Sequence, residues 1–229
     1  MKLATVIMPE NAPELQDCDS AIPDCRCSVV PARAERNSIP GMSVQYGFLA
    51  VLTQGPAYGS QLQNEFLLRA ANRRQLNAGQ VYSTLDRMTE QGLIESAGET
   101  EDGLPLYRLT AAGAEEARSW LTSGPRDARP DWDEMQDQVL MAASLDGADA
   151  AAVVADYRAA FAERIRELTH DADSRAVLAA NRAAELGARA AIEWLDEVAK
   201  ALTAHPGALI QPRSPERPRR GRKPAAALD

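Results

Sequence analysis

The sequence predicts a mainly α-helical protein with two folded regions and one small β-hairpin. Aromatic residues make up 5% of the 229 residues and apolar residues make up 45%, a balance that favours helices over sheets. Apolar residues recur at helical spacing from residue 43 onward, and the spacing changes to that of paired strands over one short stretch. Together these observations exclude an all-β sandwich.

Both ends of the chain lack this periodicity. Residues 1–41 and 211–229 are rich in proline and poor in periodic apolar residues, so both are expected to be disordered. Residues 1–41 are interpreted as a disordered leader or as a mispredicted start ahead of Met42. The predicted folded domains are 42–123 and 124–210, followed by a basic tail over 211–229.

Three helices are expected at the beginning of the first domain. One ends at Gly55, and a second runs over about 58–72. A third follows Asn77, which is expected to cap it, and ends at Gly92. Because each helix is too short to bury an apolar face alone, the three are expected to pack together.

A change of spacing after the third helix indicates a β-hairpin. Leu93–Ile94 and Leu106–Leu109 flank the polar stretch Glu99–Gly103, which is typical of a strand, a turn and a returning strand. A fourth helix, Ala111–Leu121, closes the domain. Three helices followed by a hairpin are the arrangement of a winged helix-turn-helix domain.

The second domain is predicted to contain three helices, starting at Trp132 and broken near Asp146–Gly147 and His170–Ser174. The middle helix places Val153, Tyr157, Phe161, Ile165 and Leu168 on one stripe. The last helix carries apolar and small residues at alternating steps of four and three, a heptad seam. Its members are Val177, Asn181, Ala184, Ala188, Ala191, Leu195, Val198 and Leu202. We interpret this seam as a dimerisation element, the alternative being the core stripe of a monomeric bundle.

Five aromatic residues could line an effector pocket for a planar apolar or phenolic molecule. They are Trp120, Trp132, Tyr157, Phe161 and Trp194. Ordinary core packing is the favoured alternative for them.

Several classes of protein are excluded by the sequence. No apolar stretch is long enough to cross a membrane and no secretory leader opens the chain, so the protein is interpreted as cytoplasmic. Cys18, Cys25 and Cys27 lack a fourth zinc ligand, because His170 and His205 are far away in the sequence, and no metal or cofactor is expected. Neither a nucleophile with a base nor paired acids are apparent, so no enzyme is predicted.

The motifs of the first domain resemble those of PadR-type transcriptional regulators. They are residues 43–52 (SVQYGFLAVL), 55–59 (GPAYG), 77–88 (NAGQVYSTLDRM), 91–94 (QGLI) and 107–113 (YRLTAAG). The resemblance is close over 43 to about 123 and looser over 124–204. It implies a homodimeric repressor that binds double-stranded DNA at a pseudo-palindromic operator and is released by a small-molecule or other signal. The alternative function is a winged-helix protein that acts mainly as a protein–protein interaction module.

The third helix is the predicted reading element, because the second helix of a helix-turn-helix enters the major groove. Its side chains Gln80, Ser83, Thr84 and Arg87 are expected to project outward, where Gln and Arg can pair with base edges. Asn77, at the start of this helix, is a further predicted DNA contact. The resemblance places Tyr82 against a backbone phosphate. Arg69, Arg73 and Arg74 are candidate phosphate contacts at the end of the second helix, or else a solvated helix end.

The hairpin departs from the family pattern. Acidic residues crowd it, and leucines stand where the family usually carries cations; the residues are Glu95, Glu99, Glu101, Asp102, Leu104 and Leu106. The basic tail could compensate. Its segment 217–224 (RPRRGRKP) resembles an AT-hook, in which Arg219, Arg220 and Arg222 would follow an A·T minor groove. A basic tail without base preference is the equal alternative.

Overall fold

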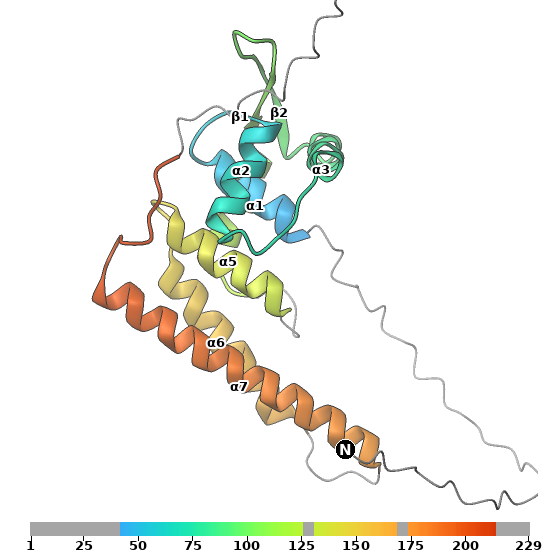
Figure 1. The fold of residues 1–229 in the computed structure, drawn as a ribbon, viewed down its shortest axis with the longest axis vertical. Coiled ribbons are helices and arrows are strands. Elements are labelled where there is room, and N and C mark those ends of the chain that lie inside the picture. Colours follow the sequence, from blue (N-terminus) through green and yellow to red (C-terminus); the bar gives the residue numbers. More distant parts are fainter. Residues whose placement is uncertain (1–41, 126–130, 169–173, 214–229) are drawn as a thin grey trace, which may run out of the picture. The chain divides into compact units, whose positions relative to one another are not determined.

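Within the described residues, the predicted first domain (42–123) holds four helices and a small sheet, and the predicted second domain (124–210) holds three helices (Figure 1). The computed structural model describes residues 42–125, 131–168 and 174–213. The elements are α1 (Met42–Leu52), β1 (Ala57–Tyr58), α2 (Gly59–Arg69), α3 (Ala78–Glu90), β2 (Ile94–Glu99), β3 (Pro105–Leu109), α4 (Ala111–Thr122), α5 (Trp132–Ser144), α6 (Ala150–Glu167) and α7 (Arg175–Ala204). The predicted fold class, a winged helix-turn-helix domain followed by helices, is confirmed.

Helices α1 and α2 pack through a close contact at a glycine. Phe48 of α1 and Phe66 of α2 meet edge to face, with ring centroids 6.1 Å apart. A Cβ at Gly47 would lie 2.4 Å from the Phe66 ring, so only glycine allows α1 this close to α2.

The sheet has one strand more than the sequence predicts. Its order is β1-β3-β2, and all neighbours are antiparallel. Strand β1 pairs Ala57 with Tyr107 and Tyr58 with Leu106. Two residues are too few to show strand periodicity, so tertiary contact with the β2–β3 hairpin, which we call the wing, decides this strand.

Helix α2 ends at Arg69, three residues before the predicted end. Ala71 and Asn72 both have φ 54°, a left-handed conformation that no helix continues through. The Asn72 N–H donates to the Leu67 carbonyl at 2.7 Å, which closes the helix end. The turn carries Arg73 and Arg74 toward α5.

A second glycine joins α4 to the wing. Thr110 caps α4 by accepting from the Gly113 N–H at 3.1 Å, and its hydroxyl donates to the Gly92 carbonyl at 2.6 Å. A Cβ at Gly113 would lie 1.9 Å from the Leu93 carbonyl oxygen, which is backbone. Helix α4 therefore rests directly on the main chain that enters β2.

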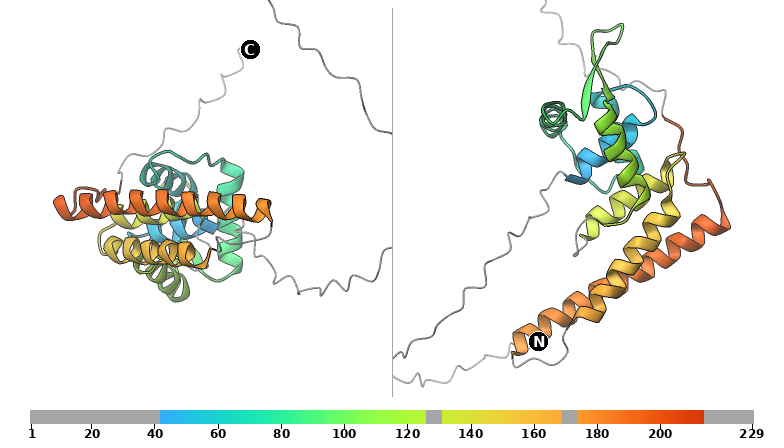
Figure 2. Two further views of the ribbon diagram at one scale, coloured as in Figure 1. Left: turned by 90° about the horizontal axis from the view of Figure 1, so that it is seen from below. Right: turned by 180° about the vertical axis from the view of Figure 1, so that it is seen from behind.

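Helices α6 and α7 lie side by side and antiparallel (Figure 2). The predicted stripe of α6 is confirmed: Val153, Tyr157, Phe161 and Leu168 are buried and Ile165 is half-buried. Arg158 of α6 pairs with Asp196 of α7 at 2.6 Å.

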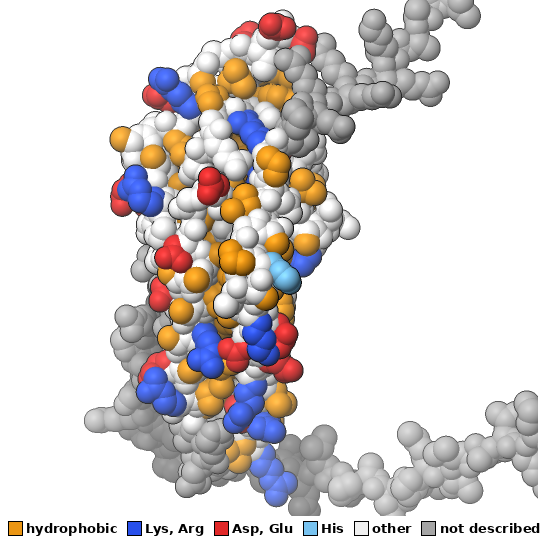
Figure 3. All heavy atoms as spheres, turned by 90° about the vertical axis from the view of Figure 1, so that its left-hand side faces the viewer, with side chains coloured by type: hydrophobic (Ala, Val, Ile, Leu, Met, Phe, Trp, Pro, Cys, Tyr) orange, Lys and Arg blue, Asp and Glu red, His pale blue; other side chains and the backbone are white. Residues whose placement is uncertain are grey.

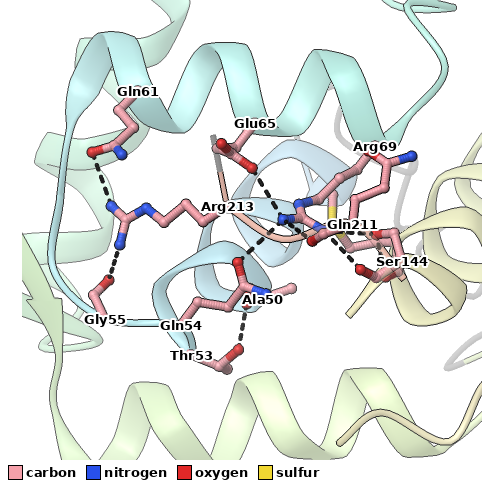
Figure 4. A network of polar contacts seen from close by, with 11 residues as sticks. Ala50, Thr53, Gln54, Gly55, Gln61, Glu65, Arg69, Ser144, Gln211 and Arg213 are labelled. Atoms are coloured by element: carbon pink, nitrogen blue, oxygen red, sulfur yellow. Dashed lines mark hydrogen bonds and ion pairs between the residues drawn. The ribbon is translucent and has the colours of Figure 1, made fainter. Parts of the chain in front are cut away.

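The residues after α7 return to the first domain. This C-terminal strap, residues 205–213, passes the end of α5, where the Gln211 N–H donates to the Ser144 carbonyl at 3.0 Å. The Arg213 guanidinium then donates to the carbonyls of Gly55 and Pro56 at 3.3 and 2.7 Å and to Gln61 Oε1 at 2.9 Å (Figure 4). The strap thus links α7 to the loop before β1 and to α2.

A buried cation lies beneath the strap. The Arg69 side chain is fully buried and pairs with Glu65 at 3.0 Å. The same guanidinium donates to the Ser144 carbonyl at 2.8 Å and to the Gln211 carbonyl at 3.0 Å (Figure 4). One side chain therefore joins α2, α5 and the strap.

Replacing Gly113 by alanine should destabilise the protein by about 3 kcal/mol, because the new methyl group would overlap backbone that cannot move aside. Gly187 of α7 is the matched control, since nothing lies within 4 Å of a Cβ built there. Gly187→Ala should stabilise by up to about 1 kcal/mol through helix propensity. Urea unfolding measures both, and equal midpoints would contradict the close approach of α4 to β2.

Replacing Arg69 by methionine should cost about 3–5 kcal/mol, because it leaves the buried Glu65 carboxylate without its cation. Arg118→Met is the control: Arg118 forms an ion pair with Glu115 within α4, and its side chain is 63% exposed. An exposed pair contributes little, so no measurable change is expected there. Similar unfolding midpoints for the two variants would show that the buried network does not stabilise the fold.

Candidate DNA interface

Helix α3 begins with a capping box. The Asn77 side chain accepts from the Gln80 N–H at 2.9 Å, and the Asn77 N–H donates to Gln80 Oε1 at 3.0 Å. The predicted N-cap is confirmed. Because an oxygen of the Gln80 amide already serves the cap, its NH₂ group is the part free to donate to a base edge.

One row of α3 points away from the core. Gln80 and Ser83 are exposed and Arg87 is half-buried, at spacings of three and four residues along one face. The Ser83 hydroxyl donates to the Gln80 carbonyl at 3.2 Å. Among the described residues, Arg87 Nε is buried with no hydrogen-bond partner. These side chains form what we call the α3 reading face: Gln80, Ser83 and Arg87.

Thr84 does not project outward as predicted. It is 5% exposed and lies with Val81, Leu85 and Met88 on the inner face of α3. Its position is one step of three from Val81 and one of four from Met88, so the inner stripe is wide enough to include it. Thr84 therefore belongs to the packing of the helix.

Tyr82 lies on the exposed surface of α3, on the other side from Gln80 and Arg87, and is 48% exposed. Its ring approaches the first residue of α2, and a Cβ at Gly59 would lie 3.3 Å from Tyr82 Cε1. This places the exposed tyrosine of α3 beside the N-terminal turn of α2.

Asp86 is an outward residue of α3 that the sequence analysis missed. It is exposed and follows Tyr82 by one helical turn. Burial and the nearby groups Asp86 and Tyr82 raise the pKa of the Tyr107 hydroxyl, which lies on β3. An exposed carboxylate on this helix can accept a hydrogen bond from cytosine.

The arginines after α2 face α5. Arg69 is buried, so the prediction that it contacts phosphate or solvent is wrong. Arg73 and Arg74 pair with the buried Asp137 at 2.6 and 2.8 Å. Their charge is partly neutralised by this carboxylate, and the predicted phosphate contacts stay a prediction.

The buried carboxylate of Asp137, on α5, joins α5 to the turn after α2. Burial raises the pKa of its carboxyl, while Arg74, Arg73 and Ser43 act in the opposite direction. The Arg74 guanidinium also donates to the Ser43 hydroxyl at 3.0 Å. This cluster fixes the turn after α2 against α1 and α5.

The wing is acidic at its tip. Glu95 pairs with Arg108 across the strands at 2.8 Å, but Glu99, Glu101 and Asp102 lie exposed at the turn. Acidic side chains accordingly crowd the top of the molecule in Figure 3, where the hairpin lies. Carboxylates in this position repel phosphates.

The five aromatic residues do not line one pocket. Trp120 stacks on Tyr46 in the core at 5.9 Å, and the buried Tyr157 stacks on Phe161 and donates to Gln138 at 2.6 Å. Burial raises the pKa of Tyr157. Core packing therefore explains Trp120, Tyr157 and Phe161.

The remaining two aromatics form a separate pair. Trp132 of α5 lies 6.4 Å from Trp194 of α7, centroid to centroid. Trp132 is 41% exposed and Trp194 is half-buried.

The centre of the heptad seam is buried within the chain. Ala188, Ala191 and Leu195 are at most 3% exposed, in the helix that packs along α6. The prediction that these three contact a partner chain is therefore wrong: the tight approach that small residues allow is used by α6. Asn181, Ala184, Val198 and Leu202 are half-buried and Val177 is 46% exposed.

Several residues that were weighed from the sequence, as predicted contacts or as rejected metal ligands, lie outside the described residues. These are Arg219, Arg220 and Arg222 of the tail, Cys18, Cys25 and Cys27, and His170. Within 42–125, 131–168 and 174–213, no three His, Cys, Asp or Glu side chains gather as a metal site. None of the helices in these same ranges is long and apolar enough to span a membrane.

Comparison with known proteins agrees with the motifs. The model of the transcriptional regulator PadR-like family matches residues 48–119. None of the curated protein sequences matches the chain.

Solved structures of Bacillus subtilis PadR are similar at low identity. The complex with operator DNA has a TM-score of 0.34 and 17% identity, covering 71% of this chain and 99% of that one. The complex with p-coumaric acid has a TM-score of 0.33 and 17% identity, covering 72% and 97%. The likeness to the family therefore rests on the match at residues 48–119. The match agrees with the resemblance that the sequence motifs indicate: residues 48–119 of this chain are similar to the transcriptional regulator PadR-like family.

Proposed function

We propose that the protein is a homodimeric repressor that reads a pseudo-palindromic operator through α3 and is released by a small apolar or phenolic molecule. The observation that carries this proposal is the α3 reading face, an exposed polar row on a helix with a capped start. Capping fixes where the helix begins, and thereby where Gln80 stands relative to a base edge.

The chemistry of the reading face suits the major groove. Arg87 can donate two hydrogen bonds to guanine, and the Gln80 NH₂ can donate to guanine or thymine oxygens. Ser83 lies between them and can donate or accept. Tyr82, beside the start of α2, would contact the backbone of the same groove.

The two chains of the dimer would contact each other through α7, at the parts of its seam that α6 leaves accessible. These are Val177 at one end of the helix and Val198 and Leu202 at the other. A symmetric dimer would place its two α3 helices about 34 Å apart, or a multiple of that, on one side of the duplex.

We assign the effector to the Trp132–Trp194 pair, because these are the two predicted pocket residues that solvent reaches. It lies where α5 meets α7, so a bound molecule would act on the contact between these helices. A planar ring stacked there would gain area without displacing core residues.

The variant Gln80→Glu separates capping from base reading. Glutamate keeps the capping box and suits a helix N-terminus, so the free energy of unfolding should not fall. A carboxylate cannot donate, so the preferred base at one position of each half-site should shift toward cytosine. Selection from random duplexes measures this preference, and an unchanged preference would remove Gln80 from the interface.

The variant Arg87→Ala should lose about 1–3 kcal/mol of discrimination at one base pair. Arg118→Ala on α4 is the control and should leave the selected sequence unchanged. If the full-length protein retards no duplex in an electrophoretic assay, including that of its own promoter, the protein–protein interaction module becomes the better interpretation.

Val177→Asp should shift the monomer–dimer equilibrium toward monomer by about tenfold or more, because the seam would bury an unpaired charge. Leu186→Asp is the matched control: Leu186 is 52% exposed and Val177 46%, and nine residues place them on opposite faces of α7. Sedimentation measures both variants. If they dimerise equally, the seam is not the dimer interface.

A further inference from the structure

Helix α3 presents an acidic side chain near the centre of its exposed face. The buried side of the helix is formed by Val81, Thr84, Leu85 and Met88. Successive residues of an α-helix are about 100° apart, so Ser83 and Asp86 each lie within about 30° of the direction opposite that side. Both residues are exposed.

The other two members of the α3 reading face lie farther from this direction. Gln80 is about 90° and Arg87 about 70° away from it, which agrees with the half-buried state of Arg87. A recognition helix in the major groove turns the centre of its exposed face toward the base edges. Asp86 therefore points more directly at the bases than either flanking residue.

The central row of α3 is built from short side chains. Gly79 lies one turn before Ser83 on this row, and Asn77 Oδ1, at 3.3 Å, is all that a Cβ at Gly79 would meet within 4 Å among the described residues. A residue without a side chain lets the backbone approach a ligand closely. The close approach that this row allows brings the short Asp86 side chain within reach of a base edge.

The Asp86 carboxylate has no cation partner in the part of the chain that the structure describes. By contrast, Glu95 of the wing pairs with Arg108 at 2.8 Å. Burial and then the charge of the nearby Asp86 raise the pKa of the Tyr107 hydroxyl, so Asp86 lies close to β3 of the wing. An unpaired carboxylate on this surface would repel phosphates, and its acceptors are free for another donor.

The chemistry of a carboxylate selects among the bases. An ionised carboxylate can only accept hydrogen bonds. In the major groove, guanine presents two acceptors and thymine presents one, whereas cytosine presents its amino group as a donor. Adenine has an amino group too, but the N7 acceptor lies beside it. Cytosine is therefore the base that suits Asp86 best.

We propose that Asp86 is a specificity-determining residue that accepts a hydrogen bond from a cytosine amino group at one position of each half-site. This inference rests on the proposed DNA binding by α3. The carboxylate lowers the affinity for every sequence by repelling phosphates and recovers it only where cytosine faces it. Asp86 thus acts partly by rejecting guanine and thymine.

Selection from random duplexes with two variants tests this role. Asp86→Asn should shift the preferred base at one position from cytosine toward adenine, because an amide can pair with adenine N6 and N7. Asp86→Ala should abolish the preference for cytosine at the same position. Asp86 makes no contact that folding needs, so both variants should keep the melting temperature of the parent protein, as circular dichroism measures.

Glu90→Gln is the matched control for the loss of charge. Glu90 is exposed and lies one turn after Asp86, at the end of α3. Recognition helices contact bases mainly through their N-terminal residues. Removing this charge should strengthen binding to all duplexes about twofold by reducing repulsion, and it should leave the base preference unchanged.

A double-mutant cycle measures the contact directly. The full-length protein and Asp86→Ala are each titrated with the selected operator and with the same duplex carrying thymine in place of the cytosine in one half-site. This base change should weaken binding by the parent protein about tenfold or more. It should alter binding by Asp86→Ala less than about twofold, because no carboxylate then faces the thymine oxygen.

The outcomes separate this inference from the proposed function. An unchanged base preference in both Asp86 variants would overturn the role of Asp86, while Gln80→Glu and Arg87→Ala could still alter the operator. An equal gain on all duplexes, as expected for Glu90→Gln, would overturn it as well. A full-length protein that binds no duplex would overturn the proposed function itself, and the role of Asp86 with it.

Discussion

The contact on which the rest of the structure depends is the buried Arg69 cation. Its charge is balanced by Glu65 one turn away, and its two terminal nitrogens also donate to Gln54, to Ser144 at the end of α5 and to the Gln211 carbonyl of the strap. A buried charge is tolerated only where it is paired and hydrogen-bonded. The position of α5, the return of the chain after α7 and the anchoring of Arg213 therefore all require the same arginine to be in place.

A second ionic cluster acts beside it at the surface of the same junction. Arg73 and Arg74 share the buried carboxylate of Asp137, which brings the turn after α2 against α5. This turn leads directly into Asn77 and the start of α3. The helical domain consequently supports the orientation of α3 through charged contacts.

On α3, one side chain also has two roles. Gln80 caps the helix with its oxygen and keeps its NH₂ for another partner, so its position is fixed before any ligand arrives. A side chain fixed in this way loses less conformational entropy on binding. The acidic hairpin beside it offers no comparable contact to phosphates, which leaves the attraction to DNA to cations elsewhere in the chain.

The sequence by itself determined the helices and the hairpin of residues 42–123, because periodicity, glycine stops and the Asn77 cap are local signals. It also identified Gln80, Ser83 and Arg87 as outward residues of α3. Only the tertiary structure decided which polar residues are buried. Thr84 and Arg69 carry no local sign of burial; their surroundings come from residues distant in sequence, as with Ser144, 75 positions after Arg69. The heptad seam of α7 shows the same limit, since an apolar stripe specifies that a face is covered but not whether α6 or a second chain covers it.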